Sequence, residues 1–154
     1  MLDGLFPRQI DNDYRGHPAA PWLMIVVVSV RIAQSLLVLC CSYYVVILAE
    51  ALPLDRYPAA ASQAIAFAMA GWKVDRLLIA LLCLLAIDRY RSMIPLMLTV
   101  LLLQELGRRA VAWLYPMTTD GVPGATRVNL VLLMLTAIAL VLSLRRRAVV
   151  SSSA

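Results

Sequence analysis

Histidine is almost missing from this sequence, and its scarcity limits the cofactors that the chain could hold. His17 is the only histidine among 154 residues, and it precedes the first long apolar stretch. Since histidine is a common axial ligand of haem iron, we expect neither a haem nor a histidine-held (bacterio)chlorophyll within the apolar segments. Asp11, Asp13 and His17 match no established metal-ligand spacing, so we expect no metal site. We predict no cofactor, and only contact with a lipid, quinone or pigment stays open.

Cysteine is scarce as well. The three cysteines, Cys40, Cys41 and Cys83, form no CxxC motif, which argues against thiol-disulfide exchange. Neighbouring side chains on a helix point about 100° apart, so a bond between Cys40 and Cys41 is not expected. The favoured interpretation is that these cysteines act as small hydrophobic residues. The sequence also shows no set of residues typical of nucleophilic catalysis, and we predict no catalytic residue.

Apolar residues are abundant. The chain is 62% hydrophobic with a mean hydropathy of +0.83, which is more apolar surface than a soluble domain of this length can bury. We therefore predict an all-α integral membrane protein, a single domain over 1–154, built as an antiparallel four-helix bundle. The expected transmembrane spans are about 22–52, 59–88, 92–115 and 126–145, with tails at 1–20 and 146–154. The second span could instead be a re-entrant or interfacial segment followed by a short span, because charges interrupt it near residues 73–76.

Basic residues are distributed unevenly around these spans. If the helices alternate in direction, the other side's loops hold only Arg56 and Arg127, and one side collects the remaining flanking arginines: Arg8, Arg15, Arg89, Arg91, Arg145, Arg146, Arg147. The positive-inside rule then places both termini in the cytoplasm. This asymmetry accounts for the net charge of +5, so no nucleic-acid partner is expected. No cleavable signal peptide is recognisable, and the first helix would act as the targeting signal.

The stretch QELGRR places charge at the centre of the third span. Glu105 can pair with Arg108 and Arg109 at helical spacings of three and four. Counted from the cytoplasmic edges, Glu105 and Asp75 both lie about 20 Å deep, at 1.5 Å per residue. Charges facing lipid at this depth are unfavourable, so they are expected to face one another. The predicted intramembrane polar network comprises Arg31, Asp75, Arg76, Gln104, Glu105, Arg108, Arg109 and Asn129.

A row of small residues on the second span supports an interior position for Asp75. Ala64, Ala68 and Gly71 follow one another at spacings of four and three, and Asp75 continues the row. Such rows allow helices to approach closely, so we expect it to pack against a neighbouring helix. Asp75 is then the natural partner of the arginine that Glu105 does not neutralise. Lys73 is expected to extend toward the outer head groups or to meet a partner, and Arg31 either joins the network or reaches the inner interface.

Two interpretations of this charged layer stay open. In one, a buried ion network fixes the register of the helices and does nothing more. In the other, Asp75, Glu105 and Arg108 line an outward-facing pocket for a small anion, a lipid head group or a proton. A transport route is poorly supported, because the inner halves of the helices offer only apolar side chains with Cys83 and Thr99.

Two stretches carry a resemblance to known proteins. LFPRQIDNDYRGHP before the first span, together with QELGRR in the third, resembles a group of small four-helix bacterial inner-membrane proteins of uncharacterised function. The general architecture also looks like that of DoxX-type proteins. The sequence KVDR in the second span departs from the first group, which is usually apolar there. The resemblance implies a multi-pass protein of the bacterial inner membrane and carries no activity to this chain.

The small size and the lack of cofactor ligands favour a non-catalytic function. We expect a non-catalytic accessory or assembly subunit of a larger inner-membrane complex, such as an energy-converting one, whose partners are other membrane subunits, further copies of the chain, and lipids. The alternative is a small membrane-embedded binding protein or enzyme that uses the Asp/Glu/Arg layer for an anion or lipid-like ligand.

Overall fold

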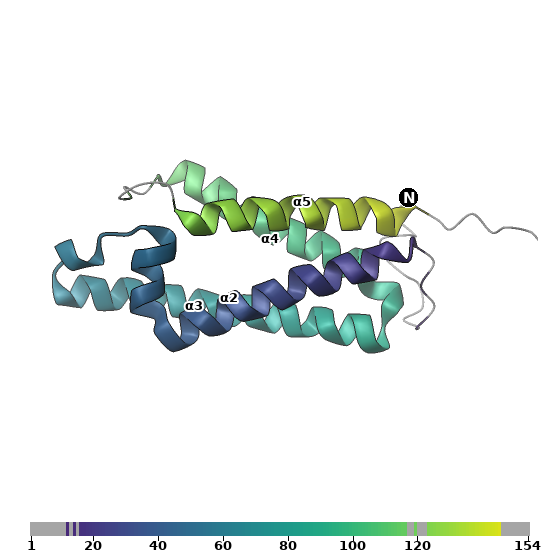
Figure 1. Ribbon diagram of the computed structural model, residues 1–154, viewed down its shortest axis with the longest axis horizontal. Coiled ribbons are helices and arrows are strands. Elements are labelled where there is room, and N and C mark those ends of the chain that lie inside the picture. Colours follow the sequence, from purple (N-terminus) through teal and green to yellow (C-terminus); the bar gives the residue numbers. More distant parts are fainter. Residues whose placement is uncertain (1–11, 13, 15, 117–118, 120–122, 146–154) are drawn as a thin grey trace, which may run out of the picture.

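The computed structural model describes residues 12, 14, 16–116, 119 and 123–145 of the chain. Four long helices form the molecule: α2 (Ala19–Glu50), α3 (Ala59–Arg89), α4 (Ile94–Leu114) and α5 (Gly124–Leu144) (Figure 1). Two short 3-10 helices, η1 (Leu54–Arg56) and η2 (Arg91–Met93), precede α3 and α4. The described residues contain no β-strand, so the expected all-α class is confirmed for them.

Proline marks the start of each long helix. Pro18, Pro58 and Pro123 directly precede α2, α3 and α5, and Pro95 lies in the first turn of α4. Proline suits these places because its fixed φ is compatible with a helix and the first helical N–H groups have no partner within the helix. The helices begin and end within three residues of the predicted apolar segments. The helix α3 is continuous through Gly71 to Arg76, as the single-helix interpretation requires.

The helices pack as two hairpins. The longest contact joins α2 to α3, α5 lies against both α2 and α4, and α3 meets α4 over a shorter stretch. Leu, Val, Ile, Met and Ala side chains from all four helices fill the centre, including Met24, Val28, Ala80, Leu98 and Leu132. This order places α2, α3 and α4 around one interior, where their central polar residues can meet.

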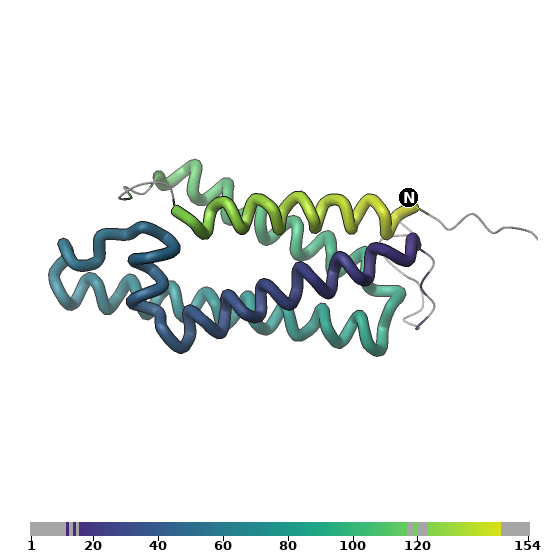
Figure 2. The backbone as a smooth tube through the Cα atoms, in the orientation of Figure 1, coloured from purple at the N-terminus to yellow at the C-terminus, as the bar shows by residue number. Residues whose placement is uncertain are grey.

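The first hairpin extends past the second at one end. The helices α2 and α3 have 32 and 31 residues, whereas α4 and α5 have 21 each. The helix α2 bends at Cys41, whose backbone is not helical (φ −136, ψ 43), and Figure 2 shows the chain turning there before it reaches η1. Ser42 Oγ donates to the Ala66 carbonyl of α3 at 2.9 Å, and Ser62 Oγ donates to the Leu54 carbonyl at 2.6 Å. These bonds fix the bent segment and η1 on α3.

The chain before α2 is attached to the end of α5. The His17 amide donates to the Leu142 carbonyl at 3.2 Å, and Tyr14 packs on the main core. Burial raises the pKa of Tyr14 to about 12. Residues 1–11, 13, 15 and 146–154 of the expected tails, and most of the expected turn over residues 118–124, lie outside the described residues.

Two helices have the length and apolar composition needed to cross a membrane. These are α2 and α5, while charged residues interrupt the apolar sequences of α3 and α4. Large apolar side chains are exposed along the bundle, including Trp22 (71%), Leu48 (80%), Phe67 (82%) and Trp113 (83%). Such an apolar exterior is typical of a chain that contacts lipid or other apolar partners.

Candidate functional site: a buried arginine cluster around Glu105

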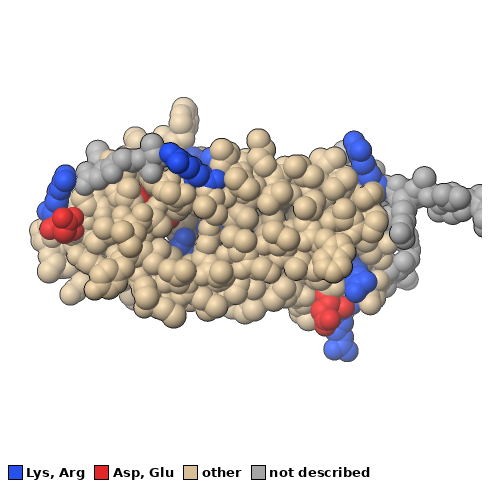
Figure 3. Space-filling model, in the orientation of Figure 1, with Lys and Arg blue, Asp and Glu red and all other residues tan. Residues whose placement is uncertain are grey.

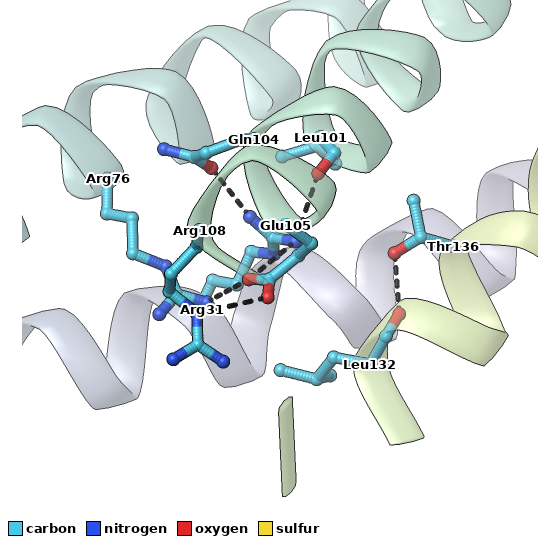
Figure 4. Close-up of polar contacts among 8 residues, drawn as sticks. All are labelled: Arg31, Arg76, Leu101, Gln104, Glu105, Arg108, Leu132 and Thr136. Atoms are coloured by element: carbon cyan, nitrogen blue, oxygen red, sulfur yellow. Dashed lines mark hydrogen bonds and ion pairs between the residues drawn. The ribbon is translucent and has the colours of Figure 1, made fainter. Parts of the chain in front are cut away.

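Glu105 is the centre of a charged cluster inside the bundle. It is the twelfth of the 21 residues of α4 and is 1% exposed. Three arginines form ion pairs with its carboxylate: Arg76 of α3 at 2.8 Å, Arg31 of α2 at 3.2 Å and Arg108 of α4 at 3.5 Å. Figure 4 shows these side chains gathered around the carboxylate. Four charged groups from three helices are thus in contact in the interior.

Arg31 is held by several acceptors. Its Nη1 donates to Gln104 Oε1 at 2.8 Å, and its Nη2 contacts the Leu101 carbonyl at 3.5 Å in addition to Glu105. Its Nε has no hydrogen-bond partner. Since both Nη1 and Nη2 contact acceptors on α4, this helix fixes the position of the Arg31 guanidinium.

Arg76 is held less completely. Its Nη2 donates to Glu105 at 2.8 Å, while Nε and Nη1 are buried without a hydrogen-bond partner. The guanidinium lies 5.8 Å from the centroid of the Trp72 ring, and Lys73 Nζ lies 4.5 Å from the same centroid. Unpartnered charged donors in the interior are unfavourable, because nothing replaces their lost hydration. Arg76 is therefore one of several buried polar groups whose hydrogen-bonding requirements the described residues do not meet.

The charges of this cluster do not balance. Arg31, Lys73 and Arg76 are at most 5% exposed, and Glu105 is the one acid among the described residues that is buried to a similar degree. Arg108 and Arg109 add two half-buried cations, and half-buried Glu50 adds one anion close enough to interact electrostatically with Lys73 and Arg76. The cluster has an excess of positive charge whether the buried groups are counted alone or together with the half-buried ones.

The surface has an opening near charged atoms. Figure 3 shows a hollow on the displayed face, toward the end of the bundle where η1 lies, with basic and acidic atoms visible inside an otherwise uncharged surface.

Most of the predicted network is brought together. Arg31, Arg76, Gln104, Glu105 and Arg108 are joined by the ion pairs and hydrogen bonds given above. Arg109 lies next to the cluster, half-buried, with Nε and Nη2 unpartnered. Asn129 of α5 is 2% exposed, and its Oδ1 accepts no hydrogen bond.

The structure corrects the expected role of Asp75. This residue is exposed and forms no ion pair with the described residues, and the small residues Ala64, Ala68 and Gly71 in the same row are exposed too. A Cβ at Gly71 would meet nothing within 4 Å. The reason is rotational: adjacent helical residues point about 100° apart, so turning Arg76 toward Glu105 turns Asp75 away from it.

Sequence reasoning also missed the burial of Lys73. It was expected near the outer head groups or with a partner, yet it is 5% exposed. Its spacing of three from Arg76 places both side chains on neighbouring parts of one helix face. This spacing could have indicated that Lys73 is buried together with Arg76. The small-residue row that continues to Asp75 favoured the other face of the helix instead.

The described residues contain no group of three or more His, Cys, Asp or Glu side chains that could hold a metal ion. No protein-family model, curated protein or solved structure matches the chain. The resemblance to small inner-membrane proteins and to DoxX-type architecture therefore stays a prediction. The site defines a class by its chemistry alone: an all-helical protein with an arginine-rich interior.

Proposed function

We propose that the chain is a multi-pass protein of the bacterial inner membrane that crosses it four times, with both termini in the cytoplasm. The two apolar helices α2 and α5, the exposed apolar exterior and the uneven distribution of arginines support this placement. At about 1.5 Å per residue, the 21 residues of α4 and of α5 match a hydrocarbon core about 30 Å thick. The longer hairpin of α2 and α3 would extend beyond the core on the outer side.

In this placement the cluster lies near the middle of the membrane. Each charge there costs about 2.5 to 3.5 kcal/mol on insertion scales, and pairing in the interior reduces that cost. Three arginines around one carboxylate are more cations than pairing requires. A network that served only to fix helix register would be better balanced by a second buried acid, whereas Asp75 is exposed and Glu50 is only half-buried.

The function that this geometry supports best is the binding of an anionic ligand at the arginine cluster. The observation that carries it is Arg76, whose Nε and Nη1 are buried without partners beside a carboxylate already shared by three arginines. An anion would accept from these donors and offset the excess charge, as carboxylates and phosphates do at arginine sites. The ligand could enter through the hollow in Figure 3.

Thermal unfolding of the full chain in mild detergent tests this proposal. A ligand that binds only the folded state stabilises it by about 2.7 kcal/mol at a hundred times its Kd. We expect anions bearing carboxylate or phosphate to raise the unfolding temperature, and Arg76→Gln to remove that increase. Arg127→Gln is the matched control, because Arg127 is exposed and lies outside the cluster.

A second candidate function is that of an accessory or assembly subunit in a larger membrane complex. The observation that favours it is the exposed row formed by Ala64, Ala68, Gly71 and Asp75. Small residues allow a helix to approach closely, and an exposed acid within an apolar surface is complemented by a base. The proposed occupant is a transmembrane helix of another subunit that carries an arginine or lysine.

Native gel migration in mild detergent distinguishes this candidate. A complex containing other subunits that is lost on Gly71→Leu and on Asp75→Leu supports it. A native chain that migrates as a monomer or homodimer, with or without these substitutions, contradicts it.

A further inference from the structure

We propose that the anionic group bound at the arginine cluster is a phosphate monoester in its doubly charged form. This inference rests on the proposed anion-binding function and specifies its ligand. It follows from three properties of the site: the size of the charge excess, the number of free donors, and the sharing of one aromatic ring by two cations.

The charge excess matches a dianion. The buried groups of the cluster are three cations, Arg31, Lys73 and Arg76, and one carboxylate, Glu105. This leaves two positive charges uncompensated among side chains that water barely reaches. A carboxylate or a phosphodiester would neutralise one of them, whereas a phosphate monoester carries about −1.5 to −2 near neutral pH.

The free donors suit an acceptor with several oxygens. Arg31 Nε, Arg76 Nε and Arg76 Nη1 are buried N–H groups without a hydrogen-bond partner. Lys73 Nζ makes no hydrogen bond or ion pair with the described residues and contacts the Trp72 ring instead. A monoester presents three terminal oxygens, each able to accept more than one hydrogen bond, while a diester or a carboxylate presents two.

Lys73 and Arg76 have like charges, interact electrostatically, and both contact Trp72. Both cations lie over its ring, at 4.5 and 5.8 Å from the centroid. Cation–π attraction holds each of them weakly, by about 0.5 to 2 kcal/mol, and does not supply the negative charge that would relieve their repulsion. A dianion that contacts both cations would do so.

Lys73 is the informative residue for a test because it does not pair with Glu105. The substitution Lys73→Met keeps the length of the side chain and removes one positive charge, so the cluster would then match a monoanion. We expect Lys73→Met to weaken binding of the monoester at least about tenfold, since a charge-assisted hydrogen bond is lost. Binding of a phosphodiester should change much less.

The experiment is native mass spectrometry of the full chain at pH 8, with three probes: phosphatidic acid, phosphatidylglycerol with the same acyl chains, and inorganic phosphate. The two lipids differ in whether the phosphate is a monoester or a diester. Inorganic phosphate tests whether the lipid chains are needed. Arg127→Met is the matched control for Lys73→Met, and circular dichroism checks that both variants remain helical.

We expect phosphatidic acid to bind the native chain at least about tenfold more tightly than phosphatidylglycerol, with that preference lost in Lys73→Met and kept in Arg127→Met. Phosphatidic acid binding without inorganic phosphate binding assigns the group to a lipid. Inorganic phosphate binding of similar strength assigns it to a diffusible phosphate, and both results support the proposal. If Lys73→Met is not helical, the preference of the native chain alone decides.

Two outcomes overturn the inference, and they can be told apart. Equal binding of phosphatidic acid and phosphatidylglycerol, both abolished by Arg76→Gln, leaves anion binding in place and excludes the doubly charged group. Binding of none of the three probes, in a chain that is folded and whose unfolding no anion affects, removes both the inference and the anion-binding function.

Discussion

At the scale of single residues, Glu105 holds the charged interior together. Its carboxylate contacts arginines from α2, α3 and α4, so removing it leaves several cations without their common partner. Arginine keeps its charge at any accessible pH and cannot lose a proton to relieve the loss. The energetic importance of Glu105 therefore exceeds that of any one arginine.

The first prediction is that Glu105→Leu strongly destabilises the chain. Loss of one partner from a buried pair costs about 3 to 5 kcal/mol in soluble proteins, and a smaller value is expected in detergent, where alternatives soften the penalty. Glu105→Gln should be milder, because it keeps an acceptor. Thermal unfolding in detergent measures both, and an unchanged stability for Glu105→Leu would show that the cluster does not exist.

A double substitution sharpens this test. Removing Glu105 and Arg76 together, both to leucine, should recover only part of the lost stability, because Arg31 stays buried and loses its own pair with Glu105. The triple change that adds Arg31→Leu should recover more. Full recovery in the double variant would mean that Arg31 does not depend on Glu105.

At the scale of the helices, rotation of α3 decides which residues enter the interior. Lys73 and Arg76 are buried, and Arg76 pairs with Glu105 of α4, whereas the row ending in Asp75 is exposed. The four helices themselves were predictable, because long apolar segments and a proline at each start define them locally. The rotation was not, since both the small-residue row and the charged pair were plausible interior faces, and only packing against α2 and α4 chooses between them.

Two glycines test the rotation and the attachment of the N-terminal segment. We expect Gly71→Ala to stabilise the isolated chain by up to about 1 kcal/mol, because alanine is the better helix former and the site is open. We expect Gly16→Ala to destabilise it by about 1 to 3 kcal/mol, since a Cβ there would collide with the Ser143 carbonyl and the Tyr14 side chain. Thermal unfolding compares the two, and a destabilising Gly71→Ala in the isolated chain would place that row against a helix after all.

At the scale of the whole molecule, the account depends on four membrane crossings. The composition indicated a membrane protein, and α2 and α5 have the properties of spans. The charges that interrupt α3 and α4 include those that build the cluster, so under the four-span proposal hydropathy alone would undercount the spans. Within the described part of the bundle, the interior pairing makes crossing by α3 and α4 physically reasonable.

Topology reporters test this placement. A reporter fused after Ala148 should be active only in the cytoplasm, and one inserted within residues 118–124 should be active only outside. If both reporters were active on the same side of the membrane, the number of crossings would be odd, three or five, and the four-span proposal would fail.

The most direct test of the anion-binding claim is to locate an anion in a crystal of the full chain grown from a lipidic mesophase with selenate, a dianion whose anomalous scattering identifies it. The account predicts an anomalous peak within hydrogen-bonding distance of Arg76 and Lys73, inside the bundle and beside Glu105. A structure that contains no anion there, with Arg76 Nε and Nη1 bonded instead to carbonyl or carboxylate oxygens of the chain, would contradict it.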